Sequence, residues 1–349
     1  MTVYASKPEI NVREKLKELD KTSGIAGEAV LRAETPQEQF NLIGAGRRNI
    51  LINGSFMVSQ RGDYTSSNTS ISAGTTNTYH LDRWQLRTGG VNSEDRRITN
   101  GYQTNSIHGD SYRIRATSSG SGYLRFLQRV EGNLAGNWIT FSGWVKSNNP
   151  NAYLMAYRSQ LLQRAFSKPH SGNGQWEYLT LTYYEEATGG DNATLYFDAG
   201  IISNTFGNTN ITTGDYLEVA QLQVELGKVA TPFEYRSYGK ELDLCKRYYQ
   251  RIQNGQLNGA RNTSTRLRLS APLSPEMRSS PSVSRISGTT VSVQGDGLGF
   301  TSTQTAVAQG SPSGTTFMGF DLAGFTGIVD RTYPGSQSTV EVFECDAEL

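Results

Sequence analysis

The feature that most constrains the fold of this chain is a series of short segments in which apolar and polar residues alternate. In 138–146, the residues Ile139, Phe141 and Val145 share one parity and polar residues mostly take the other. Similar alternation recurs in the segments 178–184, 194–199, 216–226, 265–273 and 340–342. Successive side chains of a β-strand point to opposite faces, so each segment is predicted to be a half-buried strand.

The turns between these segments point to the same fold class. The chain has 37 glycines, and clusters such as SSGSG, SNNPN and TGGDN separate the alternating runs. Many short strands with polar turns at uneven spacing are typical of a two-sheet β-sandwich or jelly roll. No repeat of fixed period is visible, which argues against a β-helix or a propeller. We therefore predict a mainly β fold with a jelly-roll β-sandwich.

Two local features refine this prediction. The apolar parity changes between Leu217 with Val219 and Leu222 with Val224, which predicts a β-bulge near Ala220. The pair Asn53-Gly54 predicts a turn that requires positive φ. The tryptophans of the alternating strands, namely Trp84, Trp144 and Trp176, are predicted to be core residues.

The chain divides into four predicted parts. Residues 1–46 hold charged helix formers, 47–236 hold most of the strands, 237–253 form one amphipathic linker helix, and 254–349 form a second, small C-terminal β domain that would be the tip. The first part is predicted to be a short helical anchor, because its two helices have too little apolar surface to fold alone. Its apolar anchoring residues are Val12, Leu16, Leu19, Phe40 and Ile43.

Charge and cysteine content exclude several classes of protein. The chain has 33 basic and 32 acidic residues, whereas a nucleic-acid binder usually has a basic excess, so we expect no nucleic-acid partner. The two cysteines, Cys245 and Cys345, cannot form a disulfide framework, and we expect two free thiols, although one disulfide stays open. The N-terminal segment lacks the apolar region of a signal peptide, and no stretch suits membrane insertion. Synthesis and folding in a host cytoplasm are expected.

Several quoted segments resemble one known family. The run RRNILINGSFMVSQRG at 47–62 resembles the start of a carbohydrate-binding-module-like jelly roll found in bacteriophage tail-fibre and virion-surface proteins. HLDRWQL at 80–86 and ITFSGWVK at 139–146 are similar to its next two landmarks. The segment 219–251, with ATPFE and paired tyrosines, resembles its end, and 266–283 resembles the strand that commonly follows. The segment ETPQEQFNLIGAGRRN resembles a virion-proximal segment of marine phages.

This resemblance implies a protein on the virion surface, often a homotrimer. It implies attachment to another virion protein, of the tail or the capsid, through residues 1–46, and adhesion to a host cell-surface glycan through several weak sites. Two alternatives stay open: a capsid (head) fibre or decoration protein with a structural or loose-adhesion role, and, less favoured, a polysaccharide depolymerase.

The candidate site residues follow from the chemistry of sugar binding, in which aromatic rings stack on C–H faces and polar side chains bind hydroxyls. The candidate glycan-binding residues are Tyr153, Tyr157, Arg158, Tyr183 and Tyr184. Asn53, Asp215 and Glu218 are weak candidate ligands of a structural calcium ion, and no other cofactor is expected. No metalloprotease, nucleophile-elbow or phosphate-loop motif is present, so no enzymatic activity is expected.

Overall fold

The computed structural model describes most of the chain from residue 48 onward. The described residues are 48–76, 78–104, 107–132, 134–158, 164–186, 195–286, 289–295, 298–302, 307–308, 314–325, 332–334 and 341–348. The predicted anchor, 1–46 with Val12, Leu16, Leu19, Phe40 and Ile43, lies outside them.

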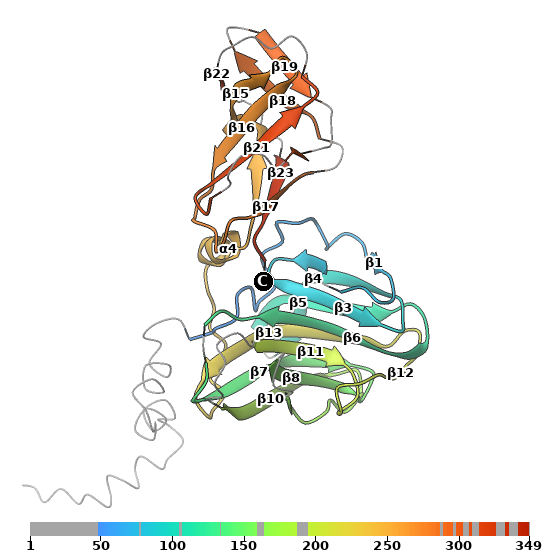
Figure 1. The fold of residues 1–349 in the computed structure, drawn as a ribbon. Coiled ribbons are helices and arrows are strands. Elements are labelled where there is room, and N and C mark those ends of the chain that lie inside the picture. Colours follow the sequence, from blue (N-terminus) through green and yellow to red (C-terminus); the bar gives the residue numbers. More distant parts are fainter. Residues whose placement is uncertain are drawn as a thin grey trace, which may run out of the picture.

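The larger part is a β-sandwich of two antiparallel sheets (Figure 1). Sheet 1 has the order β1-β4-β5-β13-β7-β10, and sheet 2 has the order β2-β3-β6-β11-β8-β9, with β12 beside β6. The strands of sheet 1 are β1 (Thr69–Ile71), β4 (Ser93–Thr104), β5 (Ile107–Ala116), β13 (Tyr216–Leu226), β7 (Asn137–Ser147) and β10 (Trp176–Glu185). The strands of sheet 2 are β2 (Thr78–Leu81), β3 (Trp84–Gly89), β6 (Gly120–Arg129), β11 (Leu195–Ile201), β8 (Ala152–Arg158), β9 (Arg164–Phe166) and β12 (Thr209–Ile211).

The core of the sandwich lies between the two sheets. Ile139, Phe141 and Val145 of β7 are fully buried there, which confirms the predicted parity. Trp84 is also fully buried, and its ring centre lies 5.3 Å from that of Phe56. Alternation along each strand therefore produces one apolar layer shared by both sheets.

Both predicted local features are present. The register of β13 against β7 shifts between Ala220 and Gln223, which confirms the predicted bulge. Asn53 has φ 59°, as predicted for this turn, whereas Gly54 is required for a different reason. A Cβ atom at Gly54 would lie 2.2 Å from the carbonyl oxygen of Leu222, so only glycine fits beside β13.

One short helix, α4 (Tyr238–Lys246), connects the sandwich to a C-terminal β region. The linker helix was predicted over 237–253, but the helix ends at Lys246 and β14 (Tyr249–Gln253) follows. Tyr249 and Ile252 are buried in strand pairing with β23 (Glu341–Asp346), which replaces the expected helical turns. Aromatic and β-branched residues favour a strand when a partner strand is available.

The C-terminal β region comprises residues 249–348. Its described sheets have the orders β14-β23-β17, β20-β21-β16-β15-β22 and β18-β19. The other strands are β15 (Asn258–Thr263), β16 (Arg266–Pro272), β17 (Ser282–Arg285), β18 (Val291–Gly295), β19 (Leu298–Ser302), β20 (Val307–Ala308), β21 (Phe317–Ala323) and β22 (Thr332–Pro334), with a 3-10 turn at Asn254–Gln256. Its core includes Phe320 and Phe343, with ring centres 4.4 Å apart.

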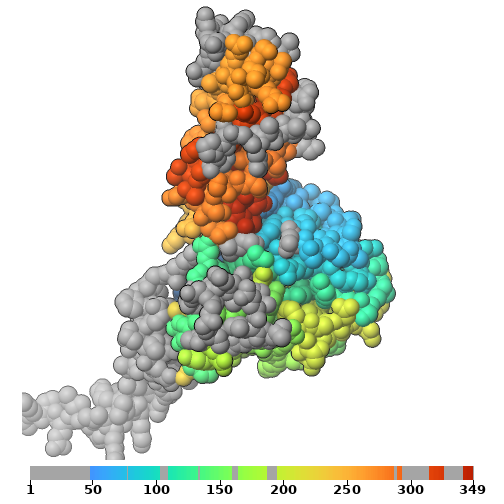
Figure 2. All heavy atoms as spheres, in the orientation of Figure 1, coloured from blue at the N-terminus to red at the C-terminus, as the bar shows by residue number. Residues whose placement is uncertain are grey.

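The C-terminal β region stands on the sandwich as a second body (Figure 2). Arg61 pairs with Asp346 at 3.0 Å, and Arg83 pairs with Glu348. These ion pairs attach β23, the strand that returns to the sandwich, and the residues that follow it. The guanidinium of Arg83 also lies 3.5 Å from the ring centre of Tyr248. Among the helices that the structure describes, none has the length and apolar character needed to cross a membrane.

Candidate functional site

The outer side of sheet 1 carries the most unusual surface of the described chain. Because Ile139, Phe141 and Val145 face the core, the even-numbered residues of β7 face outward, and β10 follows the same rule in antiparallel register. Six aromatic side chains gather on this side, and we call them the aromatic face: Tyr102, Trp138, Trp144, Trp176, Tyr178 and Tyr184.

Cross-strand pairing arranges these rings in two groups. Trp138 is directly opposite Tyr184 in the register, with ring centres 5.6 Å apart. Trp144 is directly opposite Tyr178, with ring centres 5.2 Å apart, and Tyr102 packs against Trp144 from β4 at 5.4 Å. The two pairs are six residues apart on β7, a distance of about 20 Å along a strand.

Three of these side chains are substantially exposed. Trp138 is 41% exposed, Tyr178 is 42% exposed and Tyr184 is 44% exposed. Tyr102 is fully buried and packs against Trp144 and edge-on against Trp176. The face therefore combines open rings with a packed base, which holds the rings without covering them.

Polar groups accompany the rings. Thr140 and Thr182 lie between the two aromatic pairs with their hydroxyls 3.0 Å apart. The ammonium of Lys228 lies 5.1 Å from the ring of Trp138, and that of Lys146 lies 5.8 Å from the ring of Trp176. The hydroxyl of Tyr178 is protonated at neutral pH, as in any tyrosine, and burial raises its pKa further, so it can donate a hydrogen bond. Chemically, the face can stack on apolar surfaces and exchange hydrogen bonds with hydroxyls.

The five predicted glycan-binding residues do not form one platform. Tyr184 belongs to the aromatic face. Tyr183 has the opposite parity and packs against the core, where burial raises its pKa. Arg158 is buried and forms an ion pair with Glu185 at 2.7 Å. Neither Tyr183 nor Arg158 is therefore presented on this face.

The other two predicted residues lie on the outer side of sheet 2. The ring of Tyr157 is stacked on that of Tyr196 at 4.5 Å, with Arg125 5.3 Å from its centre. Tyr153 is buried against Phe166. These tyrosines serve packing on that side, and their pairing partners were not visible in the sequence.

The sequence prediction missed the main residues of the aromatic face. Trp144 and Trp176 were predicted to be core, but both are only half-buried on the outer side. Tryptophan is a residue type that is often buried, but the parity of its position in the strand decides which side of the sheet it faces. Trp144 differs from Phe141 and Val145 by an odd number of positions, so the alternation itself places it outside.

The three candidate calcium ligands belong to separate hydrogen-bond networks. The amide of Asn53 donates to the carbonyl oxygen of Val58 at 2.8 Å. Asp215 accepts from Asn149 at 2.7 Å, and Glu218 accepts from Ser111 at 2.5 Å. No group of three histidine, cysteine or acidic side chains suited to a metal ion occurs within the described part of the chain. The predicted joint site at these three residues is therefore not assembled.

Comparison with known proteins gives likeness at the level of solved structures only. No protein-family model matches the chain, and no curated protein matches it. The enzymatically active domain of bacteriophage CBA120 tailspike protein 4 is 13% identical with a TM-score of 0.34, covering 51% of this chain. This chain spans only 21% of that tailspike structure.

Two carbohydrate-binding modules are similar at the same low level. TmCBM61 in complex with β-1,4-galactotriose is 12% identical with a TM-score of 0.30, covering 52% of this chain and 100% of that one. The family 11 module from Clostridium thermocellum is 9% identical with a TM-score of 0.29, covering 47% and 98% of the two chains. No activity is transferred from these structures.

Proposed function

We propose that this chain is a surface fibre protein of a bacteriophage particle, in which the β-sandwich adheres to host glycans through the aromatic face. The observation that carries the glycan-binding proposal is the pairing of exposed rings across β7 and β10. The phage assignment is supported by the order of the sequence landmarks, beginning with 47–62.

Folding alone does not account for this surface. Burial of a large aromatic side chain is favourable, yet Trp138, Tyr178 and Tyr184 leave much of their rings in water. Exposed apolar patches rimmed by polar groups mark interaction surfaces on soluble proteins. Sugars suit this surface because their C–H faces stack on rings and their hydroxyls meet the exposed Thr182 and the lysine side chains.

In this proposal the chain binds and does not catalyse. A single site of this open kind is weak, so firm adhesion depends on several copies acting together on one particle. A homotrimer on the virion surface, attached through residues 1–46 to a tail or capsid protein, would supply those copies.

The test uses the full chain and immobilised neutral oligosaccharides of the cello, xylo and galacto series. Tyr178→Ala and Tyr184→Ala are expected to lower affinity by about tenfold each, because truncation of an aromatic side chain that carries binding energy costs on the order of 1–2 kcal/mol. Phe317→Ala is the matched control, since Phe317 is 44% exposed on β21, away from the aromatic face. Binding by all three variants equal to that of the unchanged chain would overturn the site. Release of reducing ends from the oligosaccharides would overturn the proposal that the chain binds without catalysing.

Contact between copies of the chain is a second use of the aromatic face that can be distinguished from sugar binding. If the aromatic face were a contact between copies, Trp138→Ala would lower the sedimentation mass of the full chain and leave sugar binding unaffected. Gold-labelled antibody on intact particles separates the two placements, because label at the tail supports host recognition and label over the head supports a capsid fibre.

A further inference from the structure

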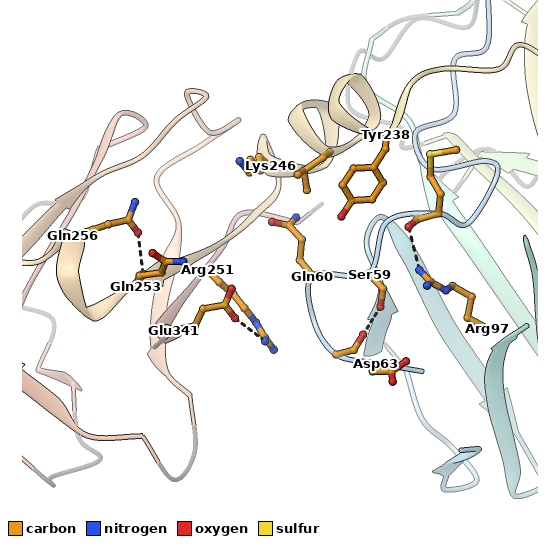
Figure 3. Close-up of a pocket in the computed structure, with 13 residues that line it drawn as sticks. Ser59, Gln60, Asp63, Arg97, Tyr238, Lys246, Arg251, Gln253, Gln256 and Glu341 are labelled. Carbon is orange, nitrogen blue, oxygen red and sulfur yellow. Dashed lines mark hydrogen bonds and ion pairs between the residues drawn. The ribbon is translucent and has the colours of Figure 1, made fainter. Parts of the chain in front are cut away.

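A cavity of about 800 Å³ lies where the sandwich, α4 and the C-terminal β region meet (Figure 3). Loop residues 57–63 form one wall, Tyr238, Leu242 and Lys246 of α4 form another, and residues of β14 and β23 close a third. Cavities of this volume accommodate small organic ligands. It is separate from the aromatic face, because none of the six aromatic residues of that face lines it.

Some of the charged side chains that line the cavity have ion-pair or hydrogen-bond partners, and one does not have a carboxylate partner. Three basic side chains and two acidic ones line it, so the balance is one positive charge: Arg97, Lys246, Arg251, Asp63 and Glu341. Arg251 pairs with Glu341 at 3.1 Å, and Asp63 accepts hydrogen bonds from Thr65. The side chain of Lys246 has no carboxylate partner among the residues that the structure describes. Arg97 donates to the carbonyl oxygen of Met57 at 3.0 Å and pairs with Asp110 at 3.9 Å, so the ammonium of Lys246 is the lining cation available to a ligand.

Hydrogen bonds fix the orientation of the neutral amide side chains in the lining. The amide nitrogen of Gln60 donates to Asp82 at 2.7 Å and to the carbonyl oxygen of Tyr249 at 3.0 Å, which leaves its amide oxygen as an acceptor. The amide oxygen of Gln256 accepts from the backbone of Gln253 at 2.9 Å, which leaves its amide nitrogen as a donor. Figure 3 shows the ring of Tyr238 pointing from the helix toward the loop that carries Ser59 and Gln60, and Lys246 lines the cavity from the same helix.

We infer that this junction cavity binds an acidic saccharide, with the carboxylate against Lys246 and the hydroxyls against Gln60, Gln256 and Tyr238. A sugar needs both donors and acceptors around it, and the two glutamines supply one of each. The inference concerns a second site and a charged ligand, so it stands independently of the aromatic face.

The arrangement favours a carboxylate over a phosphate. Phosphate sites commonly use arginine forks or clusters of backbone N–H groups. Here Arg251 is already bonded to Glu341, to Tyr249 and to the carbonyl oxygen of Arg61. A single ammonium with surrounding amides matches one carboxylate that carries neighbouring hydroxyls.

The experiment is calorimetric titration of the full chain with glucuronate, with glucose as its neutral counterpart and inorganic phosphate as a competitor. Saturable glucuronate binding, at least about tenfold tighter than glucose, is expected, because hydrogen bonds to charged groups exceed neutral ones. Added salt should weaken it. Equal affinity for glucose, or displacement by phosphate at equal concentration, would overturn the inference. Failure to bind glucuronate would likewise overturn it.

The variant that tests the role of Lys246 is Lys246→Gln, with Lys240→Gln as its matched control on the exposed side of the same helix. A loss of about tenfold or more is expected for the first and none for the second. Thermal unfolding of both checks the fold, and Gln256→Ala gives a second reading from an exposed side chain. Unchanged glucuronate affinity in Lys246→Gln and Gln256→Ala would remove the site. Tyr178→Ala should leave glucuronate binding intact even if the aromatic face binds nothing.

Discussion

The carboxylate of Glu348 accepts a hydrogen bond from the buried guanidinium of Arg83, which joins the end of the C-terminal β region to the sandwich. Arg83 is only 2% exposed, and its other contacts are the carbonyl oxygen of Arg129 at 2.7 Å and the ring of Tyr248. Glu348 is therefore its counter-charge in a place that water hardly reaches.

Removal of that carboxylate should be costly. Glu348→Ala leaves the Arg83 charge buried without its partner, and we expect a loss of about 3 kcal/mol in the free energy of unfolding. Urea denaturation followed by tryptophan fluorescence measures it. Asp243→Asn, an exposed position of α4, is the control and should change stability by less than about 0.5 kcal/mol. Similar curves for the two variants would show that the pair contributes little.

The ion pair of Arg125 with Asp198 predicts a pH dependence. Asp198 is fully buried, its Oδ1 atom has no hydrogen-bond partner, and burial raises its pKa above the ordinary value of 3.8. A carboxyl that holds its proton more tightly when folded lowers stability as pH rises through the interval between the unfolded and folded pKa values. Arg125→Leu removes the charge that opposes this shift, so the loss should become larger and extend to higher pH.

The measurement is the urea midpoint of both proteins from pH 4 to pH 8. The double variant Arg125→Leu with Asp198→Leu should be more stable at pH 8 than Arg125→Leu alone, because no buried charge is left unpaired. A parallel pH profile for wild type and Arg125→Leu would contradict the assignment of this charge pair.

Replacement of glycine by alanine is expected to change the free energy of unfolding in opposite directions at two positions. Gly54→Ala places a methyl group against the backbone of Leu222, and we expect a loss of about 1–3 kcal/mol from overpacking. Gly239→Ala in α4 meets nothing within 4 Å, so it should stabilise by up to about 1 kcal/mol through helix propensity. Thermal and urea unfolding of the two variants compare them directly, and a stabilising Gly54→Ala would contradict the close approach.

The two cysteines should be unreactive until the protein unfolds. Both are free, as expected from the sequence, and both are buried. Burial raises the pKa of Cys345 to about 12 and raises that of Cys245 well above its usual range. The reactive thiolate is therefore scarce at pH 8. Iodoacetamide at pH 8 should label neither thiol in native buffer and both in urea, and labelling of either in native buffer would contradict this burial.

The alternation of apolar residues predicted the sandwich well, because parity alone decides which side of a strand faces the core. It also located the bulge of β13 between Ala220 and Gln223. The prediction failed at Trp144, where the residue type was given more weight than the parity of its position. It failed again at Tyr249 and Ile252, which belong to the predicted helix 237–253 but pair with β23 as a strand. Tyr183 and Tyr184 are adjacent, so at most one of them could have joined an outer platform.

The junction cavity could not have been predicted from the sequence. Its lining residues range from Met57 to Glu341, and they meet only because the return strand brings the C-terminal β region back to the sandwich. The ion pairs that close this arrangement, such as Arg61 with Asp346, join residues that no local pattern connects. Long-range contacts of this kind depend on the finished topology.

The adjacency of β14 and β23 has a mechanical consequence. The chain enters the C-terminal β region along β14 and returns along β23, and the two strands are hydrogen-bonded neighbours (Figure 1). A sideways push on the far end is therefore opposed by the covalent connection through α4 into β14 and by the ion pairs at the foot of β23. Attachment at two neighbouring strands resists rotation better than a single link, so the region is suited to hold its far end at a fixed angle to the sandwich.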